Sequence, residues 1–81
     1  MTSPRLSPEQ RRALRLLASS SSGVNAALLV YDHGFKRRVL AGLVQRNLAV
    51  AKRELAMAGG KAIEVVRIRI TAAGRRAIGV G

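Results

Sequence analysis

The sequence predicts a small α+β domain in which three helices precede an antiparallel β-hairpin and a short helix follows it. Three observations predict this fold class. Apolar residues recur at helical spacing in the first half of the chain. Gly59-Gly60 gives a hairpin turn signal between two strand-like segments. In the second of these segments Val66, Ile68 and Ile70 alternate with residues of the opposite face, which is the period of a half-buried strand.

The length and composition bound the organisation of the chain. Its 81 residues argue for one domain over residues 1–81, with residues 1–5 and 79–81 as flexible tails. There is no cysteine, which excludes a disulfide framework and a thiolate metal site. No apolar run approaches the roughly 18 residues of a membrane span, and the first residues lack the apolar core of a signal peptide. We therefore expect a cytoplasmic protein, associated with the nucleoid if its source is bacterial.

The net charge is the most extreme property of the sequence. Fifteen Lys and Arg oppose four acidic residues, which gives a formal charge of +11. Such a charge indicates a polyanionic partner, most simply nucleic acid. The competing interpretations are an anionic membrane surface and a basic protein whose charge serves only solubility. We expect nucleic-acid binding without membrane association.

Residues 6–19 are expected to form the first helix. Ser7 is a good N-cap, Pro8 suits the first helical position, and Gln10 completes a capping box. Its apolar stripe consists of Ala13, Leu14, Leu17 and Ala18. The serines and glycine that follow bury no apolar surface and favour turns, so residues 19–23 are expected to form a loop.

Residues 26–33 and 36–46 are expected to form two short helices joined by a glycine-containing turn, which makes a helix-turn-helix. Asn25 is the expected N-cap of the first of these helices. Gly34 stands just after its end, where a left-handed residue is wanted. Asn47 tolerates the left-handed conformation and is expected to end the second helix.

Residues 36–46 have two contrasting sides on a helical wheel. The inward side is aliphatic and consists of Leu40, Leu43 and Val44. The outward side is basic, small or polar and consists of Arg37, Arg38, Ala41 and Gln45. Gly42, if it lies on the outward side, would let a ligand approach the backbone closely. A cationic side with small residues suits the major groove of DNA, and the alternative is a solvated side of an ordinary core helix.

Residues 48–55 and 63–70 are expected to form the two strands of a basic hairpin around Gly59-Gly60. The first strand is weak by propensity, whereas the second is the strongest strand in the chain. The aliphatic residues of the second strand are expected to face the helices. Arg67 and Arg69 should then lie on the opposite face.

The segments on either side of the hairpin resemble a known family. Thr71 can cap a last helix over residues 72–78, and Ile70-Thr71-Ala72-Ala73-Gly74-Arg75-Arg76-Ala77-Ile78 resembles the LT-x-x-G-R-x-x-L element of MarR-type winged-helix domains. Arg46-Asn47-Leu48-Ala49-Val50 resembles the k-x-G-L-v stretch of that family, with Asn47 in place of the usual glycine. The resemblance covers residues 7–78. It implies a winged helix with a three-helix helix-turn-helix core, an antiparallel hairpin as the wing and a short C-terminal helix.

Two departures from the family pattern matter. The helix over residues 36–46 is short and begins with Lys36 rather than with a Ser or Thr cap, which bears on the positions that would contact bases. The flanking helices through which many MarR-type proteins dimerise have no counterpart in these residues. The oligomeric state therefore stays open, and a homodimer is possible.

The candidate DNA-contacting residues lie on the two basic elements. On the helix and at its ends they are Lys36, Arg37, Arg38, Gln45 and Arg46. On the hairpin they are Lys52, Arg53, Lys61, Arg67 and Arg69. Arg37 and Arg38 are expected to reach guanine edges or phosphates, and Gln45 to contact the DNA backbone. The hairpin cations are expected to meet phosphates or an adjacent minor groove, with the arginines of the first helix extending the contact. For each of these residues alone, the alternative is a solvated charge.

Catalysis is not expected. His33 is the only histidine and stands at a helix end, where a capping or surface role is the usual one. Neither an acid pair of clear design nor a phosphate-binding loop is present, and no cofactor or metal is expected. Tyr31 is expected to be half-buried in the core.

Three functions remain open. A DNA-binding winged helix with a transcription-regulatory or architectural role is the first interpretation. An RNA- or ribosome-associated module is the second, although the two aromatic residues offer little stacking surface for single strands. A protein-interaction winged helix is the third, and at a charge of +11 it requires an acidic partner.

Overall fold

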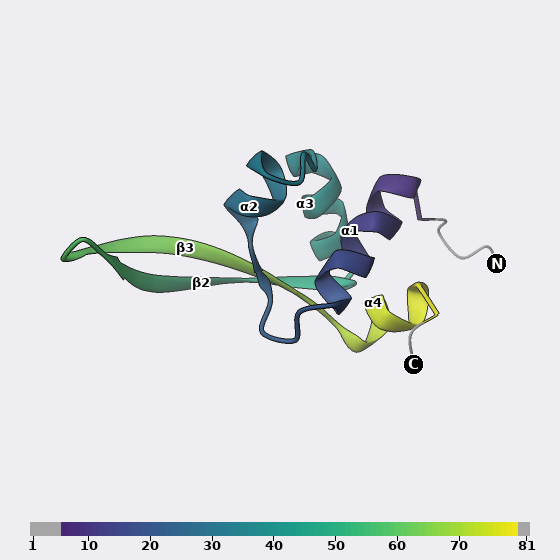
Figure 1. The fold of residues 1–81 in the computed structure, drawn as a ribbon. Coiled ribbons are helices and arrows are strands. Elements are labelled where there is room, and N and C mark those ends of the chain that lie inside the picture. The colour runs from purple at the N-terminus through teal and green to yellow at the C-terminus, as the bar shows by residue number, and fades with distance from the viewer. Residues whose placement is uncertain (1–5, 80–81) are drawn as a thin grey trace.

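Four helices and a three-stranded antiparallel sheet make up the structure, a computed structural model that describes residues 6–79. The helices gather around one end of the sheet, and a long hairpin projects beyond them (Figure 1). The elements run in the order α1 (Pro8–Ala18), β1 (Val24–Asn25), α2 (Ala26–Tyr31), α3 (Arg37–Gln45), β2 (Ala49–Ala58), β3 (Lys61–Ile70) and α4 (Ala72–Ala77). The predicted α+β class is confirmed.

The predicted N-caps Ser7, Asn25 and Thr71 are confirmed by their hydrogen bonds, and the first helix is shorter than the expected residues 6–19. The Ser7 hydroxyl accepts a hydrogen bond from the Gln10 N–H at 3.1 Å, and Gln10 Oε1 accepts one from the Ser7 N–H at 3.0 Å. Asn25 Oδ1 accepts from the Ala27 N–H at 2.8 Å. Thr71 Oγ1 accepts from an N–H in the first turn of α4 at 3.0 Å. Each of these side chains satisfies a helical N–H that has no partner within its helix.

Left-handed residues end α2 and α3, as predicted. Gly34 has a φ of 75° and Asn47 has a φ of 60°. The turn at Gly34 brings the Phe35 N–H back to the Leu29 carbonyl oxygen at 2.9 Å. Because this bond closes the end of α2 early, the helix stops at Tyr31, two residues before the expected end.

The sheet has the strand order β1-β3-β2. The hairpin of β2 and β3 is antiparallel, with Ala49 opposite Ile70 at one end and Ala58 opposite Lys61 at the other. Gly59 and Gly60 form the predicted turn, and both have the positive φ that a tight two-residue turn of matching twist requires. Both strands reach this turn, so the hairpin is longer than expected from the sequence.

The strand β1 was not expected. It contains only Val24 and Asn25, which pair with Ile68 and Arg67 of β3. Two residues are too few to give a period-two pattern, so sequence periodicity could not reveal this strand.

The core lies between the helices and the end of the sheet nearest to them. Its fully buried large side chains are Leu14, Leu17, Leu29 and Leu43. Ile68 and Ile70 of β3 are buried, and Val66 is half-buried, as expected for the face of the strand turned to the helices. Phe35 fills the turn between α2 and α3 and is only 6% exposed. Burial of these apolar side chains is the main stabilising contribution in a chain without disulfides.

The expectation that Tyr31 is half-buried was wrong, because its side chain is 73% exposed. Leu29 takes the inward position of the short helix α2 and is fully buried. Tyr31 stands two positions later, which turns it roughly 200° around the helix axis, away from the core. Its hydroxyl instead accepts a hydrogen bond from Arg37 at 3.2 Å.

The hairpin makes the molecule elongated, with principal extents of 51 × 22 × 19 Å. Of the two expected tails, residues 1–5 and 80–81 lie outside the described residues, and Gly79 lies in the turn after α4. Within residues 6–79, none of the helices combines the length and the apolar character needed to cross a membrane.

Candidate nucleic-acid interface

The outward side of α3 carries the first group of candidate residues. Leu40 and Leu43 are buried, and the helical period therefore turns Arg38, Ala41 and Gln45 to the solvent. The helix begins at Arg37, and Lys36 serves as its N-cap without a side-chain hydrogen bond. We call Lys36, Arg37 and Arg38 the α3 cluster. These three exposed cations lie at the positive end of the helix dipole, so this end of α3 is attractive to anions.

Arg37 and Arg38 differ in their surroundings. Arg37 Nη2 donates to the Tyr31 hydroxyl at 3.2 Å, which draws this guanidinium toward α2. The Arg38 side chain has neither a hydrogen bond nor an ion pair with any residue in the described range 6–79. A hydrogen bond between exposed groups contributes only about 0.5–1.5 kcal/mol, so Arg37 can exchange it for a ligand contact. Arg38 needs no such exchange.

Arg46 and Gly42 lie on the side of α3 that faces α1. Arg46 Nη1 donates to Gln10 Oε1 at 3.4 Å. A Cβ atom built at Gly42 would lie 3.3 Å from Gln10 Nε2. Gly42 is therefore not the outward point of close approach that the sequence suggested, since a side chain of α1 already occupies the space beside it.

The hairpin cations divide between the two faces of the sheet. Arg67 and Arg69 lie on the face opposite to the buried Ile68 and Ile70, as predicted. Lys52 stands directly across from Arg67 in the register, and so shares that face. We call Lys52, Arg67 and Arg69 the hairpin cluster.

Arg53 and Lys61 lie farther out on the hairpin. Arg53 is opposite Val66 in the register, so its side chain lies on the other face from the hairpin cluster. Lys61 directly follows the turn and is exposed. Neither residue belongs to the α3 cluster or the hairpin cluster.

Two ion pairs offset part of the positive charge on the hairpin. Arg67 Nε lies 3.1 Å from Glu54 Oε1, and Arg53 Nε lies 4.0 Å from Glu64 Oε1. All four side chains are substantially exposed, and ion pairs of this kind contribute about 0–1 kcal/mol. Both arginines therefore remain able to meet another anion.

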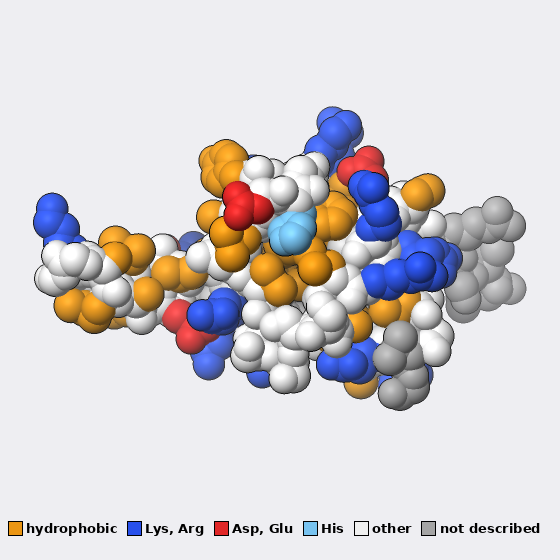
Figure 2. All heavy atoms as spheres, viewed as in Figure 1, with side chains coloured by type: hydrophobic (Ala, Val, Ile, Leu, Met, Phe, Trp, Pro, Cys, Tyr) orange, Lys and Arg blue, Asp and Glu red, His pale blue; other side chains and the backbone are white. Residues whose placement is uncertain are grey.

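The structure brings the candidates together as two clusters and not as one face. The α3 cluster belongs to a helix that packs through Leu43 on the inward side of the sheet. The hairpin cluster lies on the other side. Figure 2 shows Lys and Arg side chains gathered over the helical part, especially near α1 and α4, while the outer hairpin shows hydrophobic patches and few charged side chains in that view.

The α4 arginines are a third cationic feature that the sequence reasoning did not single out as a site. Arg75 is half-buried and Arg76 is exposed, and α4 contacts α1, which carries exposed arginines of its own. One of these, Arg12, places its guanidinium carbon 5.8 Å from the centre of the Phe35 ring. The Gly-Arg-Arg run at residues 74–76 was the available signal, but only folding shows that it lies beside α1.

Comparison with known proteins adds no assignment. The chain matches no protein-family model, and neither the curated proteins nor the solved structures contain a match to it. Within residues 6–79, no three His, Asp or Glu side chains lie close enough together to hold a metal ion.

Proposed function

We propose that the chain is a winged-helix domain of the MarR-like type that binds duplex DNA and has a regulatory or architectural role. The observation that carries this proposal is the build of α3. Its inward side is anchored by Leu40 and Leu43, and its outward side offers cations and the small Ala41 to a groove. The order of elements supports it, because a helix, a short strand, two helices and a hairpin in the sheet order β1-β3-β2 suit a helix-turn-helix with a wing.

The proposed mechanism divides the contacts by chemistry. A helix of the length and width of α3 fits the major groove, where Arg38 is positioned to reach guanine edges or phosphates. Ala41 is small enough for the helix to approach closely. The hairpin cluster contributes charge that is attracted to phosphates on any sequence, and so supports affinity more than selectivity.

Aromatic exposure favours a duplex over a single strand. Single-strand binders stack bases on several aromatic side chains. Here Phe35 is buried and Tyr31 is exposed, which leaves one accessible aromatic ring in the whole sequence. A single ring cannot form a continuous stacking platform, so a backbone-directed electrostatic mode on a duplex is the better fit.

The test is a binding titration by fluorescence anisotropy at several salt concentrations, using a labelled DNA duplex. If about six cations meet phosphates, the slope of log K against log salt should be near −5. Unlabelled duplex RNA and single-stranded DNA should compete less well than duplex DNA. A slope shallower than about −2 would show that charge does not drive binding, and better competition by RNA would favour the RNA interpretation.

Three double variants with the same loss of charge locate the interface. Arg37→Ala with Arg38→Ala should weaken binding by about 1–3 kcal/mol for a base-reading residue and flatten any sequence preference. Lys52→Ala with Arg69→Ala should weaken binding equally on all sequences and reduce the salt slope by about one unit per lost contact.

The matched control is the third double variant, Arg53→Ala with Lys61→Ala. Because it removes two charges outside both clusters, its loss of affinity should be the smallest of the three. All three should retain the wild-type circular dichroism spectrum, since surface charges rarely carry stability. If the α3 variant keeps wild-type affinity while either hairpin variant loses it, α3 is not the recognition element.

A further inference from the structure

The outer part of the hairpin has a chemistry unlike the rest of the chain. We call residues 53–66 the arm. Arg53 and Lys61 balance Glu54 and Glu64 there, so the arm has no net charge and all of the formal +11 lies elsewhere. No residue of the arm is buried, yet it carries three large apolar side chains. They are Leu55, 78% exposed, Met57, 73% exposed, and Ile63, 47% exposed.

The arm also has an unused strand edge. β1 pairs with β3 only at Ile68 and Arg67, so residues 61–66 of β3 have β2 as their only strand neighbour within residues 6–79. Their backbone groups on the other edge are available to a further strand.

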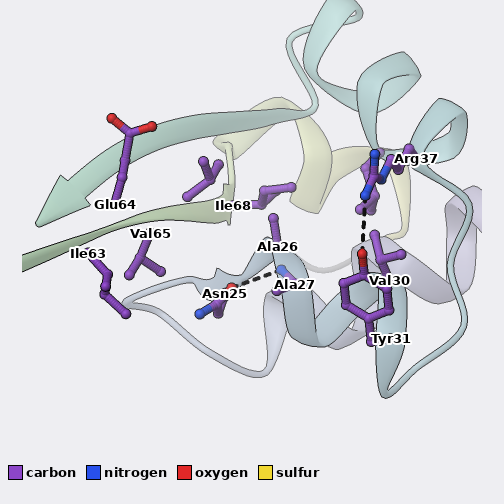
Figure 3. Close-up of a pocket in the computed structure, with 12 residues that line it drawn as sticks. Asn25, Ala26, Ala27, Val30, Tyr31, Arg37, Ile63, Glu64, Val65 and Ile68 are labelled. Carbon is purple, nitrogen blue, oxygen red and sulfur yellow. Dashed lines mark hydrogen bonds between the residues drawn. The ribbon is translucent and has the colours of Figure 1, made fainter. Parts of the chain in front are cut away.

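A groove of about 530 Å³ runs beside this edge, between β3 and α2. Its lining is mainly apolar and includes Ile63, Val65 and Val66 of the strand and Val30 of the helix. Figure 3 shows Ile63 and Val65 projecting from one side of β3 and Glu64 from the other. Tyr31 and Arg37 stand joined by their hydrogen bond at the helical end of the groove (Figure 3).

We propose that this edge of β3 pairs antiparallel with the same edge of a second copy of the chain. A free strand edge is complementary to a copy of itself, and a strand added there would fill the apolar groove. The charge distribution supports a second copy: the two arms repel each other little because each is neutral. Antiparallel pairing also places the two basic helical parts at opposite ends of the joined arms, separated by far more than the screening length of about 8 Å at physiological salt. An anionic membrane is not favoured as the partner of the arm, because a neutral arm has no net electrostatic attraction to it.

The register of this pairing follows from symmetry. Directly opposite residues share a face, so the two-fold axis must lie midway between one residue of β3 and the same residue of the second copy. Full overlap of residues 61–66 would need an axis between residues 63 and 64, which this rule excludes, so the two registers of greatest overlap place the axis at Ile63 or at Glu64. An axis at Glu64 would set two carboxylates against each other, which is unfavourable. The axis at Ile63 sets Ile63 against Ile63 of the second copy and brings the turn of each copy beside Val66 of the other.

Disulfide trapping tests both the pairing and its register. Because the sequence has no native cysteine, an introduced cysteine can form a disulfide only with its counterpart in a second copy. Directly opposite Cα atoms lie about 4.5–5.5 Å apart, inside the disulfide range. Ile63→Cys should therefore give a disulfide-linked dimer under mild oxidation. Met57→Cys is the matched control, because it is an exposed position of the arm on the other strand. Equal or faster cross-linking of the Met57 variant would overturn the proposal.

Sedimentation of the unmodified chain provides the independent measurement. It should show a concentration-dependent dimer, and a monomer at all concentrations up to about 0.5 mM would overturn the proposal. Ile63→Lys should raise the dimer dissociation constant by at least about tenfold, since an edge lysine blocks strand addition. Met57→Lys adds the same charge on β2 and should change it by less than about threefold. Circular dichroism at a concentration where all variants are monomeric checks that each is folded, and equal effects of the two lysines would reject pairing through β3.

Discussion

The helical part and the arm differ in almost every physical property although one sheet runs through both. The ten hydrophobic residues that are buried within residues 6–79 all lie outside the arm, among them Leu14, Leu17 and Leu43. The arm keeps its full ladder of cross-strand partners but buries none of its residues. Pairing between its two strands is therefore complete, whereas its side chains are not packed into a core.

This difference separates two sources of order in one small chain. An isolated two-stranded hairpin is marginal in water, because its ladder alone barely offsets the entropy of ordering it. Here the end of the hairpin nearest to the helices is held in two ways. Ile68 and Ile70 lie in the core, and a hydrogen bond between Thr71 and Asn47 joins the two ends of the hairpin, which we call the junction. The arm is ordered as an extension of that anchored end. Its stability depends on the core, whereas the core has little dependence on the arm.

Paired leucine variants give the largest expected effect and test this asymmetry. Leu43 is fully buried, so Leu43→Ala should lower the free energy of unfolding by about 2–5 kcal/mol. Leu55 is 78% exposed on the arm, so Leu55→Ala should change it by less than about 0.5 kcal/mol. Urea denaturation followed by circular dichroism measures both. Similar losses in the two variants would show that the arm packs on something in solution, and the contrast would fail.

A variant at the junction comes second in size. A Cβ atom at Gly74 of α4 would overlap the Leu48 carbonyl oxygen, just before β2, and would crowd the Ile70 side chain. Since backbone cannot move away as a flexible side chain can, Gly74→Ala should destabilise the protein by about 1–3 kcal/mol. The control is Gly79→Ser, which meets no atom within 4 Å but has a positive φ and so reports backbone strain alone. A neutral Gly74→Ala would mean that α4 is not held tightly against the start of the hairpin.

Asn47 gives a smaller effect at the same junction. Its φ of 60° is in the left-handed region, and its carbonyl oxygen accepts a hydrogen bond from Thr71 Oγ1 at 2.7 Å. Asn47→Ala should cost about 1 kcal/mol because alanine disfavours this conformation. Asn47→Gly should be neutral or slightly stabilising, since glycine adopts it without steric cost. Thermal unfolding of the two variants distinguishes them, and a destabilising glycine would show that the Asn47 side chain has a role beyond its backbone conformation.

Much of the fold was predictable because its signals are local. Capping residues, left-handed residues and the Gly59-Gly60 turn act within a few positions of themselves, and each was found where its chemistry requires it. The features that were missed depend on tertiary contacts. Strand β1 exists only because Val24 and Asn25 meet β3, and Tyr31 is exposed because Leu29 takes the inward position of α2.

The candidate site was predictable only in part for the same reason. Helical periodicity correctly turned Arg38 and Gln45 outward and Leu43 inward. Periodicity cannot tell that Gln10 of α1 lies beside Gly42, or that the hairpin cations divide between two faces of the sheet. A count of cations also conceals that the arm is neutral. The sequence alone could not reveal this neutrality, because only the structure shows at which residues the packed part of the hairpin ends and the arm begins.

Relative to the number of residues removed, the smallest effect is expected from shortening the arm, and the register shows which residues to delete. Cross-strand pairs alternate between two kinds along a hairpin, so the pair Glu54–Val65 is of the same kind as the pair Ala58–Lys61 that flanks the turn. Deleting residues 55–58 and 61–64 therefore joins Glu54 and Val65 directly through Gly59-Gly60. The pair that flanks the turn keeps the hydrogen-bonding geometry that the turn requires. The deletion removes one Lys and one Glu, so the net charge of +11 is unchanged.

The shortened chain should differ little from the full chain in its own stability and in duplex binding. It loses no buried residue, so its free energy of unfolding should change by less than about 1 kcal/mol. The salt slope should fall by no more than about one unit, the share of a single phosphate contact at Lys61. Denaturation and anisotropy titrations measure these two quantities. A salt slope reduced by about three units or more would mean that the arm, and not α3 with the hairpin cluster, holds the nucleic acid. Unfolding of the shortened chain would instead mean that the core depends on the arm, and the one-way dependence inferred from burial would be wrong.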